Sequence, residues 1–332
     1  LHLDSVRVAR ALRPGTARID PATDTAVRFD GQTDVWIPAG SEYLSDPVAL
    51  AVSPLSDLAI SFRYLNASEK QTGHSGSRAK SFEAPGDSAG APDLPGAKTI
   101  EHWYDLAGVD VAAPAEAASV VALGDSITDG HASTTDGNDR WTDFLARRLQ
   151  AEGGSHAWGV LNLGIGGNRI LQDGLGPNAL ARFDRDVLAE PGAEAVIILE
   201  SINDLGTLTV KGEVPPAEHD ALVGRLIGAF RQMIARAHQR GLRVYGATVL
   251  PDGASGYYHP GARNEADRQK LNAWIRDSGV FDGVIDWDAA MRDPRDHSRL
   301  NPAYDCGDGL HPSPAGYRWM AEAVPLGLFA AP

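Results

Sequence analysis

The sequence contains a serine, an asparagine and an Asp–His pair whose side chains together suit acyl transfer. Ser126 lies in LGDSITDG, Asn203 lies in SINDLG, and DGLHP contains Asp308 and His311. Acyl transfer needs a nucleophile, a base that accepts its proton, an acid that orients the base, and donors that stabilise an oxyanion. In a turn that leads into a helix, a spacing of three lets the Asp308 carboxylate reach the Nδ1–H of His311. The other ring nitrogen, Nε2, is then left for Ser126.

Two of these segments, and a glycine loop at residues 164–168, directly follow short apolar runs. SVVAL leads into residues 124–126, GVLNL into the glycine loop 164–168, and AVIILE into residues 201–204. Bounded runs of this kind are typical of parallel strands that are covered on both faces. Ligands of such sheets bind outside the carboxyl ends of the strands. A hydroxyl, a glycine loop and a carboxamide are therefore expected at one edge, and this coincidence favours a functional Asp–His pair over a helix cap with a surface histidine.

The segments between these strands have the periodicity of helices. Residues 140–149 and 222–241 each place apolar side chains on one helical face, and a last helix begins after Pro312 and Pro314. The two faces consist of Trp141, Phe144, Leu145 and Leu149, and of Leu222, Leu226, Phe230, Met233, Ile234 and Ala237. Alternating strands and helices predict a three-layer α/β/α domain with a parallel sheet over residues 113–332.

Residues 1–112 have a different pattern. Short Val- and Ile-rich runs, separated by Pro and Gly turns, predict a smaller all-β domain of sandwich or jelly-roll type. Strands are expected at residues 4–11, 16–20, 25–29, 34–38, 47–52 and 57–64, with a returning strand at 99–111. Residues 66–98 are rich in Gly, Ser, Ala and Pro and are expected to form one long loop.

In this order, GDSIT, NLGIGGN, SINDLG and DGLHP resemble the blocks of the GDSL/SGNH hydrolase family across most of the second domain. The resemblance implies an SGNH-type fold and a serine hydrolase in which Ser126 is the nucleophile, His311 the base and Asp308 its partner. It also implies oxyanion donors at the backbone N–H groups of Ser126 and Gly167 and at the side chain of Asn203. It implies no metal and no organic cofactor.

The sequence departs from the family at one position, and three residues are candidates for substrate binding. Ser201 stands where the family usually has glycine, so its side chain is expected to narrow the pocket and to limit the size of the acyl group. Asn168 and Arg169 follow the glycine loop and are the other two candidates. Arg169 also occupies the position where a G-x-G-x-x-G motif requires glycine, which argues against dinucleotide binding. A G-x-S-x-G nucleophile elbow does not occur in the chain.

Several other polar residues near these segments are interpreted as structural. Asp125 and Asp204 flank the catalytic candidates, and we expect them to accept hydrogen bonds from loop backbone. His131, His259 and His297 are expected to be solvated loop residues.

Composition limits the partners and the cofactors. The formal net charge of -14 argues against nucleic acid and an anionic membrane as partners. No apolar run reaches the roughly 20 residues that cross a bilayer. The single cysteine, Cys306, excludes an intrachain disulfide and is expected to be an inert packing residue. Because the chain starts at Leu1, a removed leader and thus a secreted or periplasmic location is favoured, with the cytoplasm and the oligomeric state left open.

The layout of a β domain followed by an SGNH-like domain resembles bacterial carbohydrate esterases, including the acetyl-xylan type. The long loop at 66–98 is polar, whereas long acyl chains usually call for an apolar groove or lid. We therefore expect removal of acetyl or other short acyl groups from a carbohydrate, with the β domain as an accessory wall. A general short-chain or aryl esterase or lipase is the alternative. A third hypothesis is a carbohydrate-binding protein with a degenerate hydrolase scaffold. The aromatic residues Trp36, Tyr43 and Trp103 of the β domain support it, and the complete catalytic set opposes it.

Overall fold

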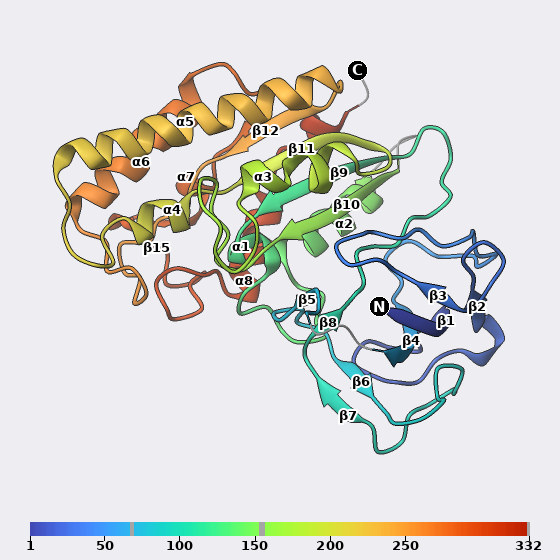
Figure 1. The fold of residues 1–332 in the computed structure, drawn as a ribbon. Helices are drawn as coiled ribbons and strands as arrows, with labels where there is room; N and C mark the ends of the chain where they lie inside the picture. The colour runs from blue at the N-terminus through green and yellow to red at the C-terminus, as the bar shows by residue number, and fades with distance from the viewer. Residues whose placement is uncertain (67–69, 153–156, 331–332) are drawn as a thin grey trace. The chain divides into compact units, whose positions relative to one another are not determined.

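The computed structural model describes three stretches of the chain, residues 1–66, 70–152 and 157–330. The chain divides into two compact units, and Figure 1 shows its course. One unit consists of residues 1–112 and 135–137, and the other consists of residues 113–134 and 138–332.

The larger unit is built on a five-stranded sheet in which every neighbouring pair is parallel. The strands are β9 (Ala118–Gly124), β10 (Trp158–Gly164), β11 (Ala193–Leu199), β12 (Arg243–Ala247) and β13 (Gly283–Ile285). Their order across the sheet is β10-β9-β11-β12-β13. The prediction of a parallel sheet is confirmed, and its first three strands begin and end close to the apolar runs that predicted them.

Apolar side chains cover both faces of this sheet. Every residue of β9 is buried, and along the strand Val120 and Ala122 belong to one apolar cluster while Val121 and Leu123 belong to the other. The first cluster also contains side chains from α2 (Trp141–Glu152), α7 (Trp287–Met291) and α8 (Pro314–Glu322). The second includes α3 (Ala179–Phe183), α5 (Pro216–Gln239) and α6 (Ala262–Asp277). The two groups of helices enclose the sheet as the outer layers of an α/β/α fold (Figure 1).

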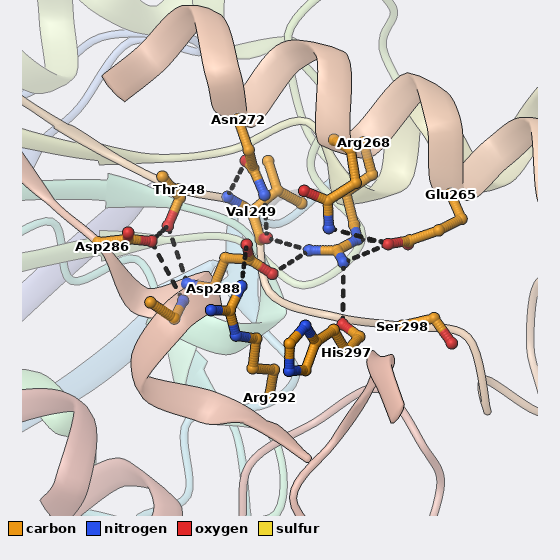
Figure 2. Close-up of polar contacts among 12 residues, drawn as sticks. Thr248, Val249, Glu265, Arg268, Asn272, Asp286, Asp288, Arg292, His297 and Ser298 are labelled. Atoms are coloured by element: carbon orange, nitrogen blue, oxygen red, sulfur yellow. Dashed lines mark hydrogen bonds and ion pairs between the residues drawn. The ribbon is translucent and has the colours of Figure 1, made fainter. Parts of the chain in front are cut away.

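The predicted apolar helix faces are confirmed in α2 and α5, whereas no helix was predicted at the position of α6. In α6 the buried residues include Asn264, Asp267, Arg268 and Asn272 beside Leu271 and Ile275, so the helix lacks a continuous apolar stripe. Figure 2 shows the hydrogen bonds of Arg268 and Asn272. The Arg268 guanidinium donates to the carbonyl of Val249 at 2.9 Å and to Asp288 at 2.6 Å, and it pairs with Glu265. These bonds join α6 to the chain that leaves β12 and to α7.

The smaller unit is formed by antiparallel strands, as its sequence predicts. β1 (His2–Arg10) pairs along its length with β4 (Leu58–Asn66), and also with β2 (Thr25–Val27) and β3 (Val35–Trp36). Two short ladders join β5 (Gly73–His74) to β8 (Trp103–Tyr104), and β6 (Ser81–Glu83) to β7 (Lys98–Ile100). Its apolar cluster is centred on Leu3, Val6, Val8, Val27 and Val35.

Some of the predicted elements of this unit are wrong. Residues 16–20 contribute only an isolated bridge between Ile19 and Ala11, and residues 47–52 form no strand. Val48 and Leu50 are nevertheless partly buried, because their side chains pack against the apolar cluster from irregular backbone. The expected loop 66–98 contains β5 and β6, and its residues 67–69 lie outside the described part of the chain.

The Arg268–Asp288 pair leads to a prediction about stability. Both side chains are almost completely buried, so Arg268→Ala leaves the Asp288 carboxylate with less compensation inside the protein. We expect this substitution to lower the free energy of unfolding by about 3 kcal/mol in urea denaturation. Arg292→Ala is the matched control, because Arg292 is 3.8 Å from the same carboxylate and one-third exposed. It is expected to cost less than about 1 kcal/mol, and equal effects of the two substitutions would contradict the assignment.

Candidate active site

Ser126 lies where β9 passes into the short helix α1 (Ser126–Asp129). The side chain of Asp125 accepts a hydrogen bond from the N–H of Ile127 at 2.9 Å, so it bonds to backbone as expected, and it does so as the cap of this helix. The turn before it is crowded: a Cβ on Gly124 would lie 2.1 Å from Oγ1 of Thr128. Glycine at 124 therefore allows α1 to begin directly at the strand end.

A continuous hydrogen-bond chain links Ser126, His311 and Asp308. The Ser126 Oγ lies 2.8 Å from Nε2 of His311, and Nδ1 of the same ring lies 2.6 Å from the Asp308 carboxylate. An ionised carboxylate only accepts, so Nδ1 carries the proton and Nε2 accepts from the serine hydroxyl. The structure thus brings together the three residues that the sequence singled out.

The Asp308 carboxylate is held as an anion. Desolvation acts to raise its pKa, but hydrogen bonds from the His311 ring and from the N–H groups of His311 and Leu310 outweigh it and lower the pKa below its usual value. The loop is shaped by Gly309, which has a φ of 73° and at which a Cβ would lie 2.2 Å from the carbonyl oxygen of Ala254. The local fold therefore fixes both the position and the charge of the group that orients His311.

Cys306 lies on the same loop but is not activated. It is exposed, which corrects the expectation that it is a packing residue. Desolvation of the sulfur, together with the nearby carboxylates of Asp308 and Asp305, raises the pKa of the thiol to about 11. Cys306 therefore remains a neutral thiol near pH 7, as its expected inertness requires.

Asn203 lies at the start of α4 (Ile202–Thr207), just beyond β11. Its Nδ2 donates to the backbone carbonyl of Asn168 at 2.7 Å, and its Oδ1 accepts from the hydroxyl of Tyr258 at 2.5 Å. The next residue, Asp204, accepts hydrogen bonds from the N–H groups of Ile170 and Leu171, which confirms its expected role in holding loop backbone. This arrangement ties the end of β11 to the glycine loop after β10.

The glycine loop exposes a backbone donor at Gly167. Gly167 has a φ of 70°, and neither its N–H nor that of Ser126 donates a hydrogen bond to another group in residues 1–66, 70–152 and 157–330. Preceding it, Gly164 packs so closely on α1 that a Cβ would lie 2.1 Å from the N of Asp129. The loop therefore lies against the helix that begins with Ser126.

Of the three candidate substrate contacts, Asn168 is held by structural hydrogen bonds, and contact of Ser201 and Arg169 with substrate stays a prediction. Asn168 is 1% exposed; its Nδ2 donates to the carbonyl of Pro177, and its Oδ1 accepts from Arg182. Ser201 is fully buried with a φ of 101°, a conformation that favours glycine, and its Oγ has no hydrogen-bond partner within the described residues. Arg169 is half-buried and bonds to the side chain of Gln172 and the carbonyl of Asp173, and its contact with substrate stays a prediction.

His131 is not the solvated loop histidine that we expected. Its ring lies over the ring of His311, with centroids 4.0 Å apart, and the exposed ring of Tyr257 meets His311 edge-on at 6.0 Å. Donor atoms of His131, Asp308 and His311 all lie within 4.8 Å of one another. Both nitrogens of His311 are already hydrogen-bonded, however, so the geometry suits proton transfer better than metal binding. His259 and His297 are exposed, as expected, although His297 lies in the strand β15 (Asp296–Leu300) and not in a loop.

Arg182 is a supporting residue that the sequence did not reveal. Its side chain, from α3, is completely buried and donates to the carbonyls of Leu163 at 2.7 Å and Gly124 at 3.1 Å, at the ends of β10 and β9. It also forms an ion pair with Asp186 at 2.9 Å. In the sequence, Arg182 and Asp186 are indistinguishable from an ordinary surface pair four residues apart.

Buried carboxyl groups surround this arginine. Burial, with repulsion from Asp204 and Asp129, raises the pKa of Asp125 to about 7, and Arg182 only partly opposes this. Burial and the charge of Asp125 also raise the pKa of Glu200, which is 1% exposed and 3.8 Å from the guanidinium. The carboxyl groups of Asp125 and Glu200 therefore bind protons more tightly than exposed carboxylates do.

A family model of the GDSL-like lipase/acylhydrolase family matches residues 122–319, more than half of the chain. The chain belongs to this family. As a GDSL-like acylhydrolase it is a hydrolase of carboxylic esters, and a serine–histidine–aspartate triad with an oxyanion hole is typical of the group. Comparison with curated protein sequences gives no match.

Solved structures of GDSL hydrolases are similar to the chain. A GDSL-like lipase from Bacteroides thetaiotaomicron is 23% identical, covers 66% of this chain and 92% of its own, and has a TM-score of 0.47. A lipolytic protein of the G-D-S-L family from Desulfitobacterium hafniense is 22% identical, with coverages of 62% and 96% and a TM-score of 0.46. An acetyl xylan esterase, AlAXEase, is 19% identical, with coverages of 62% and 96% and a TM-score of 0.45. The family assignment rests on the family model.

No helix in the described part of the GDSL chain has the length and apolar character of a membrane span.

The raised pKa of Asp125 leads to a prediction about pH and stability. Between pH 3.8, the usual pKa of an aspartate, and about pH 7, Asp125 of the folded protein keeps a proton that the same residue of the unfolded chain has lost. This contribution favours folding below pH 4 and is lost as the pH rises to 7. We expect Asp125→Asn, which keeps the acceptor for Ile127, to flatten the decline in unfolding free energy from pH 4 to 7 by up to about 1.4 kcal/mol per pH unit.

The control for this measurement is Asp220→Asn. Asp220 is exposed, and its hydrogen bond from Lys270 lowers its pKa, so its titration falls below this pH range. The control is expected to leave the slope between pH 4 and 7 unchanged. An unchanged slope in Asp125→Asn as well would contradict proton uptake at Asp125.

Proposed function

We propose that this acylhydrolase is a serine esterase in which Ser126 is the nucleophile, His311 the general base and Asp308 its orienting acid. The observation that carries the proposal is the hydrogen-bond chain from the Ser126 hydroxyl through both ring nitrogens of His311 to the Asp308 carboxylate. It begins at a strand end, where ligands of parallel sheets bind. The presence of all three residues in this hydrogen-bond chain argues against a degenerate scaffold that only binds carbohydrate.

In the proposed mechanism, Ser126 attacks the ester carbonyl carbon while its proton moves to Nε2 of His311. The C–O π bond breaks, and the resulting oxyanion accepts hydrogen bonds from the N–H groups of Ser126 and Gly167 and from Nδ2 of Asn203. One such donor is typically worth about 10²–10³ in rate. The carbonyl π bond then re-forms, the C–O bond to the alcohol breaks, and His311 gives its proton to the leaving alcohol. Water next attacks the acyl carbon while His311 takes its proton, and the bond from that carbon to Oγ of Ser126 breaks as His311 returns the proton to the serine. Asp308 stabilises the imidazolium at both stages.

We further propose that the substrate carries a short acyl group, most simply acetyl, on a carbohydrate. Two side chains near the proposed triad support this class. Leu175 is 86% exposed and would lie 3.2 Å from a Cβ on Gly167, so it offers a small apolar contact next to the proposed oxyanion site. Tyr257 presents an exposed ring beside His311, with the apolar face and polar tip that suit a sugar. The same ring suits an aryl alcohol, so an aryl or general short-chain esterase is the second candidate.

The first test replaces the nucleophile. Ser126→Ala is expected to abolish hydrolysis of p-nitrophenyl acetate without changing the thermal unfolding midpoint by more than a few degrees, because only one hydroxyl is lost. Ser278→Ala is the control, since its hydroxyl, at the end of α6, has no hydrogen-bond partner in the described residues. Wild-type turnover by Ser126→Ala would end the proposal.

The second test addresses the acyl group and the alcohol. Acetate release is measured across a panel of acetylated glycans, alongside p-nitrophenyl acetate, butyrate and octanoate. A carbohydrate deacetylase should show its highest kcat/KM on one acetylated glycan and a decline from acetate to octanoate among the chromogenic esters. A preference for octanoate would rule out the deacetylase, and equal rates on all glycans with fast aryl acetate hydrolysis would favour the second candidate.

A further inference from the structure

The orientation of the Asn203 carboxamide decides whether it can stabilise an oxyanion. Only the Nδ2 side donates hydrogen bonds, and a flipped amide would present Oδ1 to the negative charge. Nδ2 lies 2.7 Å from the backbone carbonyl of Asn168, a group that can only accept. This contact fixes which side of the amide is nitrogen, and it uses one of the two N–H groups. The second N–H is the one available for an oxyanion.

The other end of the amide is held by Tyr258. Its hydroxyl lies 2.5 Å from Oδ1 of Asn203 and must donate, because Oδ1 only accepts. Burial, with repulsion from Asp125 and Asp252, raises the pKa of Tyr258 to about 12. The hydroxyl therefore keeps its proton through the neutral range, and the amide is bonded at both ends to groups that do not reverse their roles.

The surrounding chain is built to receive the Tyr258 ring. A Cβ on Gly206, one turn further along α4 from Asn203, would lie 2.4 Å from that ring. On the other side, Oγ of Ser255 accepts hydrogen bonds from the N–H of Tyr258 and from that of the preceding residue. The N–H of Gly256 donates to the carbonyl of Asp308 at 3.2 Å, which ties this loop to the Asp–His segment.

We propose that Tyr258 is a positioning residue that holds the Asn203 amide with its second N–H towards the oxyanion. Tyr258 acts through Asn203 and does not touch the reacting atoms. The inference rests on the proposed function, since it assigns a partner to one of the proposed oxyanion donors. It adds a residue that lies outside the four sequence segments and that is 55 positions from Asn203 along the chain.

A double-mutant cycle tests this role. Tyr258→Phe removes the hydroxyl and keeps the ring, and it is expected to lower kcat on p-nitrophenyl acetate about tenfold, the effect of one lost orienting hydrogen bond, with KM changed less than twofold. Asn203→Ala is expected to lower kcat about 100-fold or more. If Tyr258 acts through Asn203, the double variant should be no slower than Asn203→Ala alone.

Tyr245→Phe is the matched control. Tyr245 donates its hydroxyl to the carbonyl of Leu328, also at 2.5 Å, and belongs to β12 in the apolar cluster on the α2 and α8 face of the sheet. It is expected to lower the thermal unfolding midpoint at least as much as Tyr258→Phe does while leaving kcat unchanged. This comparison separates positioning from a general loss of stability.

Three outcomes would overturn the inference. They are an unchanged kcat in Tyr258→Phe, an effect confined to KM, or a further tenfold loss when the substitution is added to Asn203→Ala. Failure of the proposed function is recognised separately, by wild-type turnover in Ser126→Ala. If Ser126→Ala is inactive and Tyr258→Phe is normal, only the role of Tyr258 is wrong.

Discussion

The close approach of α1 to the carboxyl ends of β9 and β10 is the constraint on which the site depends. A side chain at Gly124 or Gly164 would collide with α1, since its Cβ would lie 2.1 Å from Thr128 or Asp129 respectively. β9 pairs with both β10 and β11, so the ends of all three strands lie side by side. Ser126, the glycine loop and Asn203 follow these ends directly, and their mutual placement is therefore inherited from the register of the sheet.

Electrostatics reinforces this edge from inside the protein. Arg182 binds carbonyls at the ends of two strands and the side chain of Asn168, so one buried cation joins the serine turn to the glycine loop. The buried carboxyls of Asp125 and Glu200 lie near it with raised pKa values, whereas the pKa of Asp308 is lowered by its hydrogen bonds. The acidic groups beside Arg182 and beside His311 thus differ in pKa according to their burial and their donors, and the carboxylate that faces His311 is the one held as an anion.

The residues proposed for catalysis were predictable because each lies in a short local pattern: a serine or an asparagine after an apolar strand, and an Asp–His pair before a helix. Their supports were not. Arg182 and Tyr258 reach the site from distant parts of the chain, and no local pattern separates them from surface residues. β13 has three residues, which are too few to show the alternation of a strand. α6 buries arginine and asparagine side chains, so its sequence lacks the apolar stripe that indicates a buried helix face. The strand predicted around Val48 and Leu50 is absent. Apolar residues alone do not reveal whether the side chains that pack on a core come from a paired strand or from irregular backbone.

The central claim is that Ser126 forms a covalent bond to the acyl carbon, and active-site labelling tests it most directly. The folded protein is treated with a fluorophosphonate, which phosphonylates activated serines, and the labelled peptide is identified by mass spectrometry. If Ser126 is the nucleophile, we expect one adduct per chain, on the peptide that contains Ser126, and no adduct after denaturation, because the hydroxyl is activated only by the folded contact with His311. An adduct on a different serine, or an unlabelled protein that the reagent nevertheless inactivates, would contradict it.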